Sequence, residues 1–106
     1  MLNHCKGNIL NMLKNYREIV KEVKGVVKEI DPSAEVYVFG SVVRGTYTAA
    51  SDIDVLVIVK DISKKYKIMV EVYRRIDAPI ELHVVTSTMF ERWYKRFIPE
   101  NELVKI

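Results

Sequence analysis

The stretch that decides the fold is GSVVRGTYTAASDIDVLVIV, residues 40–59. A small Gly40-Ser41 step follows the apolar run 36–39, and two carboxylates one residue apart, Asp52 and Asp54, open a second apolar run. The first feature suits a polyphosphate, because glycine lets a ligand approach the backbone closely. The second suits divalent metal, because hard cations bind carboxylate oxygens. The stretch therefore predicts a turn and a strand that hold an anion and a cation side by side.

The two carboxylates are informative because of their spacing. Side chains at positions i and i+2 of a strand point to the same face, and their Cα atoms are about 6.5 Å apart. Asp52 and Asp54 could therefore bind one cation, or share a pair of ions about 3.5–4 Å apart. Aspartate is depleted in strands, and such local conflicts are typical of functional sites. The alternative for Asp-x-Asp alone is a solvated loop end beside a turn.

The Gly40-Ser41 step predicts an anion-binding helix start. Residues 35–39 are rich in β-branched and aromatic side chains, which favours a strand. Ser41 is a good N-cap residue, so a short helix is expected over residues 41–46. A helix N-terminus offers free N–H groups to phosphate, and Arg44 could add a fork of donors one turn later. The alternative is an ordinary strand-to-helix turn capped by serine.

Spacing joins these features into a recognisable pattern. Gly40-Ser41, ten further residues and then Asp52-Ile53-Asp54 resembles the signature of the polymerase-beta-like nucleotidyltransferase superfamily. The longer pattern, with Arg44-Gly45 and the strand after Asp54, resembles the minimal nucleotidyltransferases of bacteria and archaea. The resemblance implies an α/β (α+β) nucleotidyltransferase fold, in which helices flank a small mixed sheet of about three to four strands.

Length and composition limit the possibilities. The 106 residues predict one domain, residues 1–106, with a single core. The net charge of +3 is a mild bias toward anionic partners such as nucleotides. It is too small to indicate a nucleic-acid-binding surface, so nucleic acid is an unlikely partner. The lone Cys5 allows no internal disulfide, so a cytoplasmic location is expected. No apolar run reaches membrane-spanning length, and no signal peptide is recognisable at the start.

The N-terminal third predicts one long amphipathic helix. Apolar residues recur at alternating steps of four and three from Ile9 to Ile30, so a helix is expected over residues 8–30. Asp31-Pro32 ends it, because the residue before proline leaves the helical region. The apolar stripe either packs on the protein's own sheet or meets a second protein. The second case would allow an oligomer through this helix.

The second half of the chain predicts two helices around a third strand. Ser63 could cap a helix that ends near Arg75, and residues 80–85 read as a strand. A capping box that starts at Thr88 predicts a last helix over residues 89–97. That helix is expected to bury Phe90, Trp93, Tyr94 and Phe97. Residues 100–106 carry no clear signal.

The resemblance also implies a third carboxylate on a later strand beside the Asp-x-Asp strand. Glu81 is the only acid inside the strand 80–85, and neighbouring strands lie about 4.8 Å apart. Many members of the superfamily have aspartate there, so glutamate is a departure. The alternative for Glu81 is a solvent-facing strand residue. His83 shares its face and is either a hydrogen-bonding neighbour of the site or a buried structural histidine.

The resemblance implies a Mg²⁺-dependent transfer of AMP from ATP. Gly40, Ser41 and Arg44 would bind the phosphates, and Asp52, Asp54 and Glu81 would bind metal. Minimal nucleotidyltransferases are often encoded beside HEPN proteins, which are RNase-type toxins. The resemblance implies that they silence the toxin by adenylylating a tyrosine, as antitoxins. The alternatives are a non-catalytic antitoxin that masks its partner, or a nucleotidyltransferase that acts on a small molecule or RNA.

Overall fold

The computed structural model describes residues 7–106. The α-helices are α1 (Gly7–Lys14), α2 (Tyr16–Ile30), α3 (Ser41–Arg44), α4 (Lys65–Arg75) and α5 (Ser87–Met89). The strands are β1 (Glu35–Phe39), β2 (Ile53–Val59), β3 (Ile80–Thr86) and β4 (Val104–Lys105). The 3-10 helices are η1 (Ile62–Lys64) and η3 (Glu100–Glu102), and η2 (Phe90–Tyr94) is a turn of π-helix. Cys5 lies outside the described residues.

The four strands form one mixed sheet in the order β3-β2-β1-β4. β2 runs antiparallel to β1 and parallel to β3, and β4 adds to the outer edge of β1 in antiparallel fashion. The parallel pair needs a crossover connection, which α4 supplies. This arrangement confirms the predicted mixed sheet flanked by helices, with the run 53–59 as a central strand.

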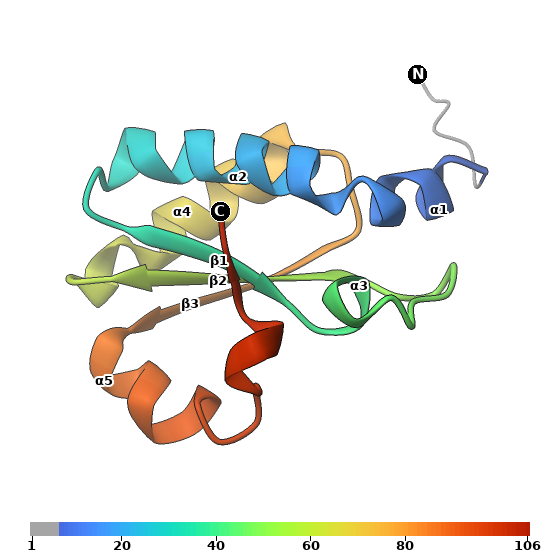
Figure 1. Cartoon of the computed structure of the whole chain (residues 1–106). Coiled ribbons are helices and arrows are strands. Elements are labelled where there is room, and N and C mark those ends of the chain that lie inside the picture. The colour runs from blue at the N-terminus through green and yellow to red at the C-terminus, as the bar shows by residue number, and fades with distance from the viewer. Residues whose placement is uncertain (1–6) are drawn as a thin grey trace.

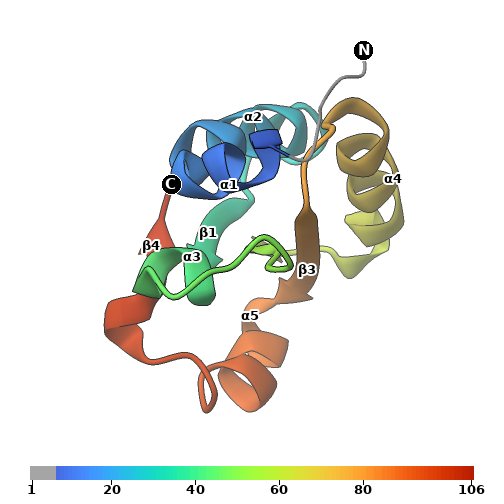
Figure 2. The same ribbon diagram turned by 90° about the vertical axis from the view of Figure 1, so that its right-hand side faces the viewer.

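Helices cover the two faces of the sheet differently. The longer helices α2 and α4 lie together on one face, whereas α5 and the segment that follows it lie on the other (Figures 1 and 2). α3 lies at the end of the sheet where β1 leads into β2 (Figure 1). The second face is therefore covered only by short, irregular C-terminal elements.

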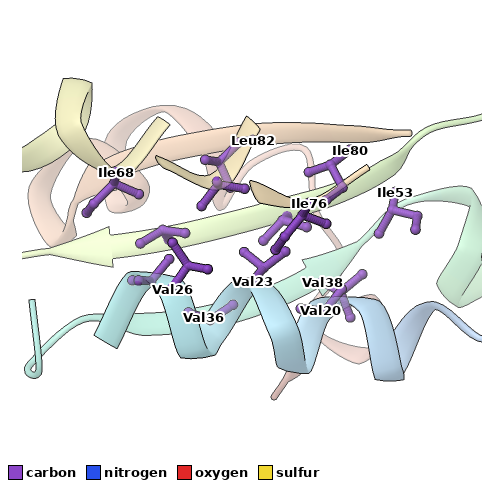
Figure 3. Close-up of a cluster of buried hydrophobic side chains, with 14 of the residues drawn as sticks. Val20, Val23, Val26, Val36, Val38, Ile53, Ile68, Ile76, Ile80 and Leu82 are labelled. Carbon is purple, nitrogen blue, oxygen red and sulfur yellow. The ribbon is translucent and has the colours of Figure 1, made fainter. Parts of the chain in front are cut away.

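The core lies between the sheet and α2 and α4. Alternate strand residues face the two helices, as the two-residue period of a strand requires. The close-up in Figure 3 shows side chains of α2, α4 and all three long strands meeting there. The labelled members, all buried, are Val20, Val23, Val26, Val36, Val38, Ile53, Ile68, Ile76, Ile80 and Leu82. The stripe of α2 thus packs on the protein's own sheet.

The prediction of a single helix over residues 8–30 is wrong in one detail, because the helix is interrupted at Asn15. The Asn15 side-chain amide donates to the main-chain oxygen of Asn11 at 2.9 Å. Asparagine side chains compete in this way with the backbone hydrogen bonds of a helix. The two halves, α1 and α2, are separated by this one residue.

Three predicted helix starts also need correction. The cap of α3 is Gly40, and the helix ends at Arg44, earlier than the expected residue 46. Asp61 caps the segment before α4, because its carboxylate accepts from the Ser63 amide at 3.0 Å. Thr86 begins the C-terminal helix, since its hydroxyl accepts from the Met89 amide at 3.2 Å.

The C-terminal part differs most from the prediction. The expected helix 89–97 is instead α5 followed by the π-turn η2. Trp93 is 62% exposed and Phe97 is 78% exposed, so these two aromatic residues are not buried as predicted. The segment after them turns back, and β4 pairs with Tyr37 and Val38 of β1. None of the described helices is long and apolar enough to cross a membrane.

Candidate active site

A row of three side chains crosses the sheet on the face opposite α2. In the strand register, Asp54 of the central strand pairs with Phe39 on one side and Glu81 on the other. Val55 and Leu82, their neighbours in sequence, belong to the buried core on the opposite face. Because side chains alternate along a strand, burial of these apolar residues directs Asp54 and Glu81 away from the core.

Asp54, Glu81 and His83 bring their ligand atoms together. One atom from each of these residues lies within 4.8 Å of the other two, and no other such group of metal-ligating side chains occurs in residues 7–106. The Asp54 side chain is mostly buried, whereas Glu81 is 58% exposed. Asp52 lies one residue before β2, is exposed, and is not part of this group. The structure thus brings together Asp54 and Glu81, and leaves Asp52 nearby on the loop.

His83 is held between two aromatic rings. Its ring centroid lies 5.5 Å from that of Phe39 and 5.6 Å from that of Tyr94. Its Nδ1 atom lies 3.4 Å from the Tyr94 hydroxyl. Its Nε2 atom lies 3.4 Å from Glu81 Oε1 and 3.9 Å from Asp54 Oδ1. The side chain therefore lies in the site and faces both carboxylates, rather than in the core.

The carboxylates change the charge state of this histidine. Asp54 is the largest influence and raises the pKa of His83, with a further contribution from Glu81, while partial burial acts in the opposite direction. Opposite charges nearby favour the charged form of a titratable group. Near neutral pH, His83 therefore carries a positive charge more often than a free histidine does, and Nε2 must give up its proton before it can bind a cation.

Gly40 forms the turn that carries the chain from β1 to α3. Its φ of 88° and ψ of −156° lie in a region that only glycine adopts readily. A Cβ atom at this position would collide with the Asp54 carboxylate. The glycine is thus required both by the backbone and by the close approach of Asp54. Ser41 follows as the first residue of α3 and lines the same cavity as Asp54.

Arg44 is occupied by a contact with the C-terminal segment. Its Nη1 atom lies 3.1 Å from Glu102 Oε1, and both side chains are partly exposed. Arg44 is the last residue of α3 and Glu102 the last residue of η3, so the contact joins two elements that are far apart in the sequence. The ion pair therefore ties the segment that covers the sheet to the turn that begins with Gly40.

A cavity of about 710 Å³ joins these groups. Gly40, Ser41 and Arg44 line one part, and Asp54, Glu81 and His83 line another. The remaining wall is mostly apolar and comes from the C-terminal segment and β1, through Phe39, Met89, Trp93, Tyr94, Phe97, Ile98, Pro99 and Glu102. A backbone turn, two carboxylates and an aromatic wall thus share one open space, which is how small-molecule sites are built.

A model of the nucleotidyltransferase domain matches residues 20–106, which is most of the chain. The chain belongs to the nucleotidyltransferase domain family. The matched region includes the Gly40-Ser41 turn and all three candidate carboxylates, so the cavity lies within the family domain.

Two solved structures resemble this nucleotidyltransferase domain. One, provisionally described as a nucleotidyltransferase, is 32% identical with a TM-score of 0.66, over 81% of this chain and 95% of its own. Another, also provisionally described as a nucleotidyltransferase and from Sulfolobus solfataricus, is 30% identical with a TM-score of 0.56, over 99% of this chain and 89% of its own. Both likenesses support the fold of the nucleotidyltransferase domain as described above.

Sequence reasoning missed part of this nucleotidyltransferase site. Trp93, Tyr94 and Phe97 were assigned to the core, but they line the cavity. Their helical spacing is the same for a core stripe and for a cavity wall, so periodicity gave no signal. Glu102 was missed because the tail carries no recognisable pattern. The signal that could have been weighed more heavily is the Glu81-x-His83 spacing, which places both side chains on one face of a strand.

Proposed function

We propose that this nucleotidyltransferase transfers AMP from ATP to a tyrosine hydroxyl of a partner protein, a HEPN-family toxin, and thereby acts as its antitoxin. The observation that carries the proposal is the meeting of the Gly40-Ser41 turn with Asp54 and Glu81 in one cavity. Phosphates need N–H donors, and their charge needs a divalent cation between carboxylates. The lining of this one cavity includes a candidate for each role, the Gly40-Ser41 turn for the phosphates and the two carboxylates for the cation.

The residues divide the work by their chemistry. Gly40 and Ser41 would hold the β- and γ-phosphates against the start of α3. Asp52 and Asp54 would bind the Mg²⁺ that accompanies ATP, and Glu81 would complete a second metal position beside the acceptor. The two clustered carboxylates fit a hard cation, because hard cations prefer oxygen ligands. Mg²⁺, when bound, would neutralise charge on the phosphates.

The transfer itself is a displacement at the α-phosphorus. The acceptor oxygen forms a bond to that phosphorus, and the bond to the bridging oxygen of the β-phosphate breaks. Pyrophosphate leaves with the electron pair, and the hydroxyl proton passes to the Glu81 carboxylate. Catalysis of such transfers depends mainly on positioning the reactants and neutralising their charge. A small domain can supply both.

The apolar wall of the cavity favours an aromatic acceptor. Phe39, Trp93 and Phe97 line the space beside the carboxylates, and Trp93 and Phe97 are exposed. Aromatic rings stack on one another with a gain of about 0.5–1.5 kcal/mol beyond the area that they bury. A tyrosine side chain would place its ring on this wall with its hydroxyl near Glu81. Exposed aromatic residues are also common anchors for protein partners.

Mass spectrometry tests the proposal directly. The partner is incubated with the protein, ATP and Mg²⁺, and we expect its mass to increase by one AMP, located on a tyrosine. Asp54→Asn should abolish the shift, whereas Asp61→Asn, the same change at a carboxylate outside the cavity, should not. A shift that persists in folded Asp54→Asn would contradict the assignment.

The masking alternative is separated by a test in cells. The toxin is co-expressed with an Asp52→Ala, Asp54→Ala double variant at matched levels. If transfer is the mechanism, this variant should fail to protect the cells. Protection equal to that of the parent, without any change in toxin mass, would make masking the mechanism. Transfer to a small molecule or an RNA would instead leave the toxin unmodified while ATP is consumed.

A further inference from the structure

The group formed by Asp54, Glu81 and His83 offers a nitrogen atom as well as oxygen atoms to a metal ion. His83 Nε2 is a buried atom and makes no hydrogen bond to any described residue, although it lies 3.4 Å from Glu81 Oε1 and 3.9 Å from Asp54 Oδ1. Buried polar atoms are nearly always hydrogen-bonded, so an unsatisfied one calls for an explanation such as an ion.

The spacing of the three ligand atoms fits one ion. Two ligands that are each about 2.1 Å from a cation lie about 3.0–3.4 Å apart, at octahedral and tetrahedral angles respectively. The observed separations from His83 Nε2, 3.4 and 3.9 Å, are close to this range. All three ligand atoms lie within 4.8 Å of one another, so side-chain rotations that move them by about an ångström would bring them to one centre.

The surroundings of His83 present Nε2 to that centre. A histidine that binds metal usually donates its other ring N–H to an acceptor, which fixes the tautomer. Here Nδ1 lies 3.4 Å from the Tyr94 hydroxyl oxygen, which can accept that proton and leave the Nε2 lone pair free. The contact with the Phe39 ring holds the imidazole from another side. The orientation is therefore set before any ion arrives.

We propose that Asp54, Glu81 and His83 form a mixed oxygen–nitrogen site that selects Mn²⁺ over Mg²⁺. Carboxylates suit Mg²⁺, Ca²⁺ and Mn²⁺, whereas imidazole suits transition metals. Mn²⁺ accepts both ligand types. This inference deepens the proposed function, on which it rests for its role, by making the second metal position manganese-selective. The ion that accompanies the nucleotide at Asp52 and Asp54 remains Mg²⁺.

Binding without nucleotide tests the site apart from activity. Mn²⁺ and Mg²⁺ affinities are measured by calorimetry and by electron paramagnetic resonance on the protein and on His83→Gln, which puts an amide oxygen in place of the imidazole. We expect the ratio of Mn²⁺ to Mg²⁺ affinity to fall about tenfold or more in the variant, the size of loss typical for metal-site partners. An unchanged ratio would overturn the proposal.

Spectroscopy identifies the ligand itself. Bound Mn²⁺ should show coupling to an imidazole nitrogen, which should disappear in His83→Phe, a variant that keeps a ring between Phe39 and Tyr94. The other histidine of the chain, His4, provides the matched control, because His4→Gln should keep the coupling. Absence of nitrogen coupling in the parent, or its loss in the His4 variant alone, would refute the site.

The two proposals fail in different ways. Mn²⁺ bound through His83, with no AMP added to any partner, would leave this site standing and refute the proposed transfer. AMP transfer without nitrogen coupling would support the proposed transfer and refute the metal site at His83. Thermal unfolding of each variant shows that it is folded before its affinity is compared. If His83→Phe does not fold, the affinity ratio of His83→Gln decides.

Discussion

Replacement of Gly40 by alanine should damage the fold and the site together, for two separable reasons. The first is backbone strain, because the φ and ψ of Gly40 are adopted readily only by glycine. A residue held in such a region costs about 1–3 kcal/mol. The second is crowding, because the new Cβ would collide with the Asp54 carboxylate. Overpacking of this kind also costs about 1–3 kcal/mol, so Gly40→Ala should lower the free energy of unfolding by about 2–6 kcal/mol.

Gly45 offers a matched control for the strain. It also has a positive φ, 78°, but a Cβ placed there meets nothing within 4 Å. Gly45→Ala should therefore cost only the strain of the left-handed conformation, about 1–2 kcal/mol. The difference between the two variants isolates the contribution of the contact with Asp54.

A double-mutant cycle gives the decisive measurement. Urea unfolding is followed in the presence of a chelator for the parent, Gly40→Ala, Asp54→Ala and the double variant. Removing the carboxylate removes the collision, so Gly40→Ala should cost about 1–3 kcal/mol less when residue 54 is alanine. A coupling below about 0.5 kcal/mol would be no larger than the additivity error of independent sites. The close packing of Gly40 on Asp54 would then be refuted.

Further predictions concern residues outside this contact. Gly25→Ala on the exposed face of α2 should raise the free energy of unfolding by up to about 1 kcal/mol, because alanine favours a helix more than glycine does. A Cβ atom there meets nothing within 4 Å. An unchanged melting temperature would contradict this prediction. Hydrogen bonds from Ser33 lower the pKa of Asp31, so this stabilisation is present above the unfolded pKa of about 4 and is lost as pH falls through the folded value. The cost of Ser33→Ala, about 1 kcal/mol in chemical unfolding at neutral pH, should shrink in acid. Glu102→Gln should lower the free energy of unfolding by less than about 1 kcal/mol, because the ion pair of Glu102 with Arg44 is partly exposed. A larger loss would contradict this estimate.

The parts of the site that the sequence could predict are set by local rules. The Gly40-Ser41 turn follows from a glycine after an apolar strand. The strand 53–59 follows from its apolar run, and burial of Val55 and Val57 leaves Asp54 on the other face. The family resemblance implied that Glu81 lies on a strand beside the Asp-x-Asp strand, next to Asp52 or Asp54, and the register has it opposite Asp54.

The parts that could not be predicted depend on contacts distant in sequence. β4 has two residues, too few for a period-two pattern, and it forms only because β1 has a free edge. Trp93 lies in the π-turn η2, which changes the faces that a regular helix would present, and Phe97 lies beyond the end of this turn. Tyr94, which contacts His83, is the last residue of this π-turn, so the sequence left the role of His83 open.

The register of β2 also determines whether a preparation of this protein can contain folded molecules with a shifted sheet. If β2 paired with its neighbours one residue out of register, the Asp54 side chain would point into the apolar layer beneath α2 and Val55 would face the cavity. This follows because side chains alternate strictly along a strand. Such a molecule would bury a carboxylate without a partner, which costs several kcal/mol, and would therefore unfold rather than persist. Folded but inactive molecules with a shifted sheet should not accumulate. The fraction of protein that has Asp54 in the cavity should therefore equal the fraction that is folded.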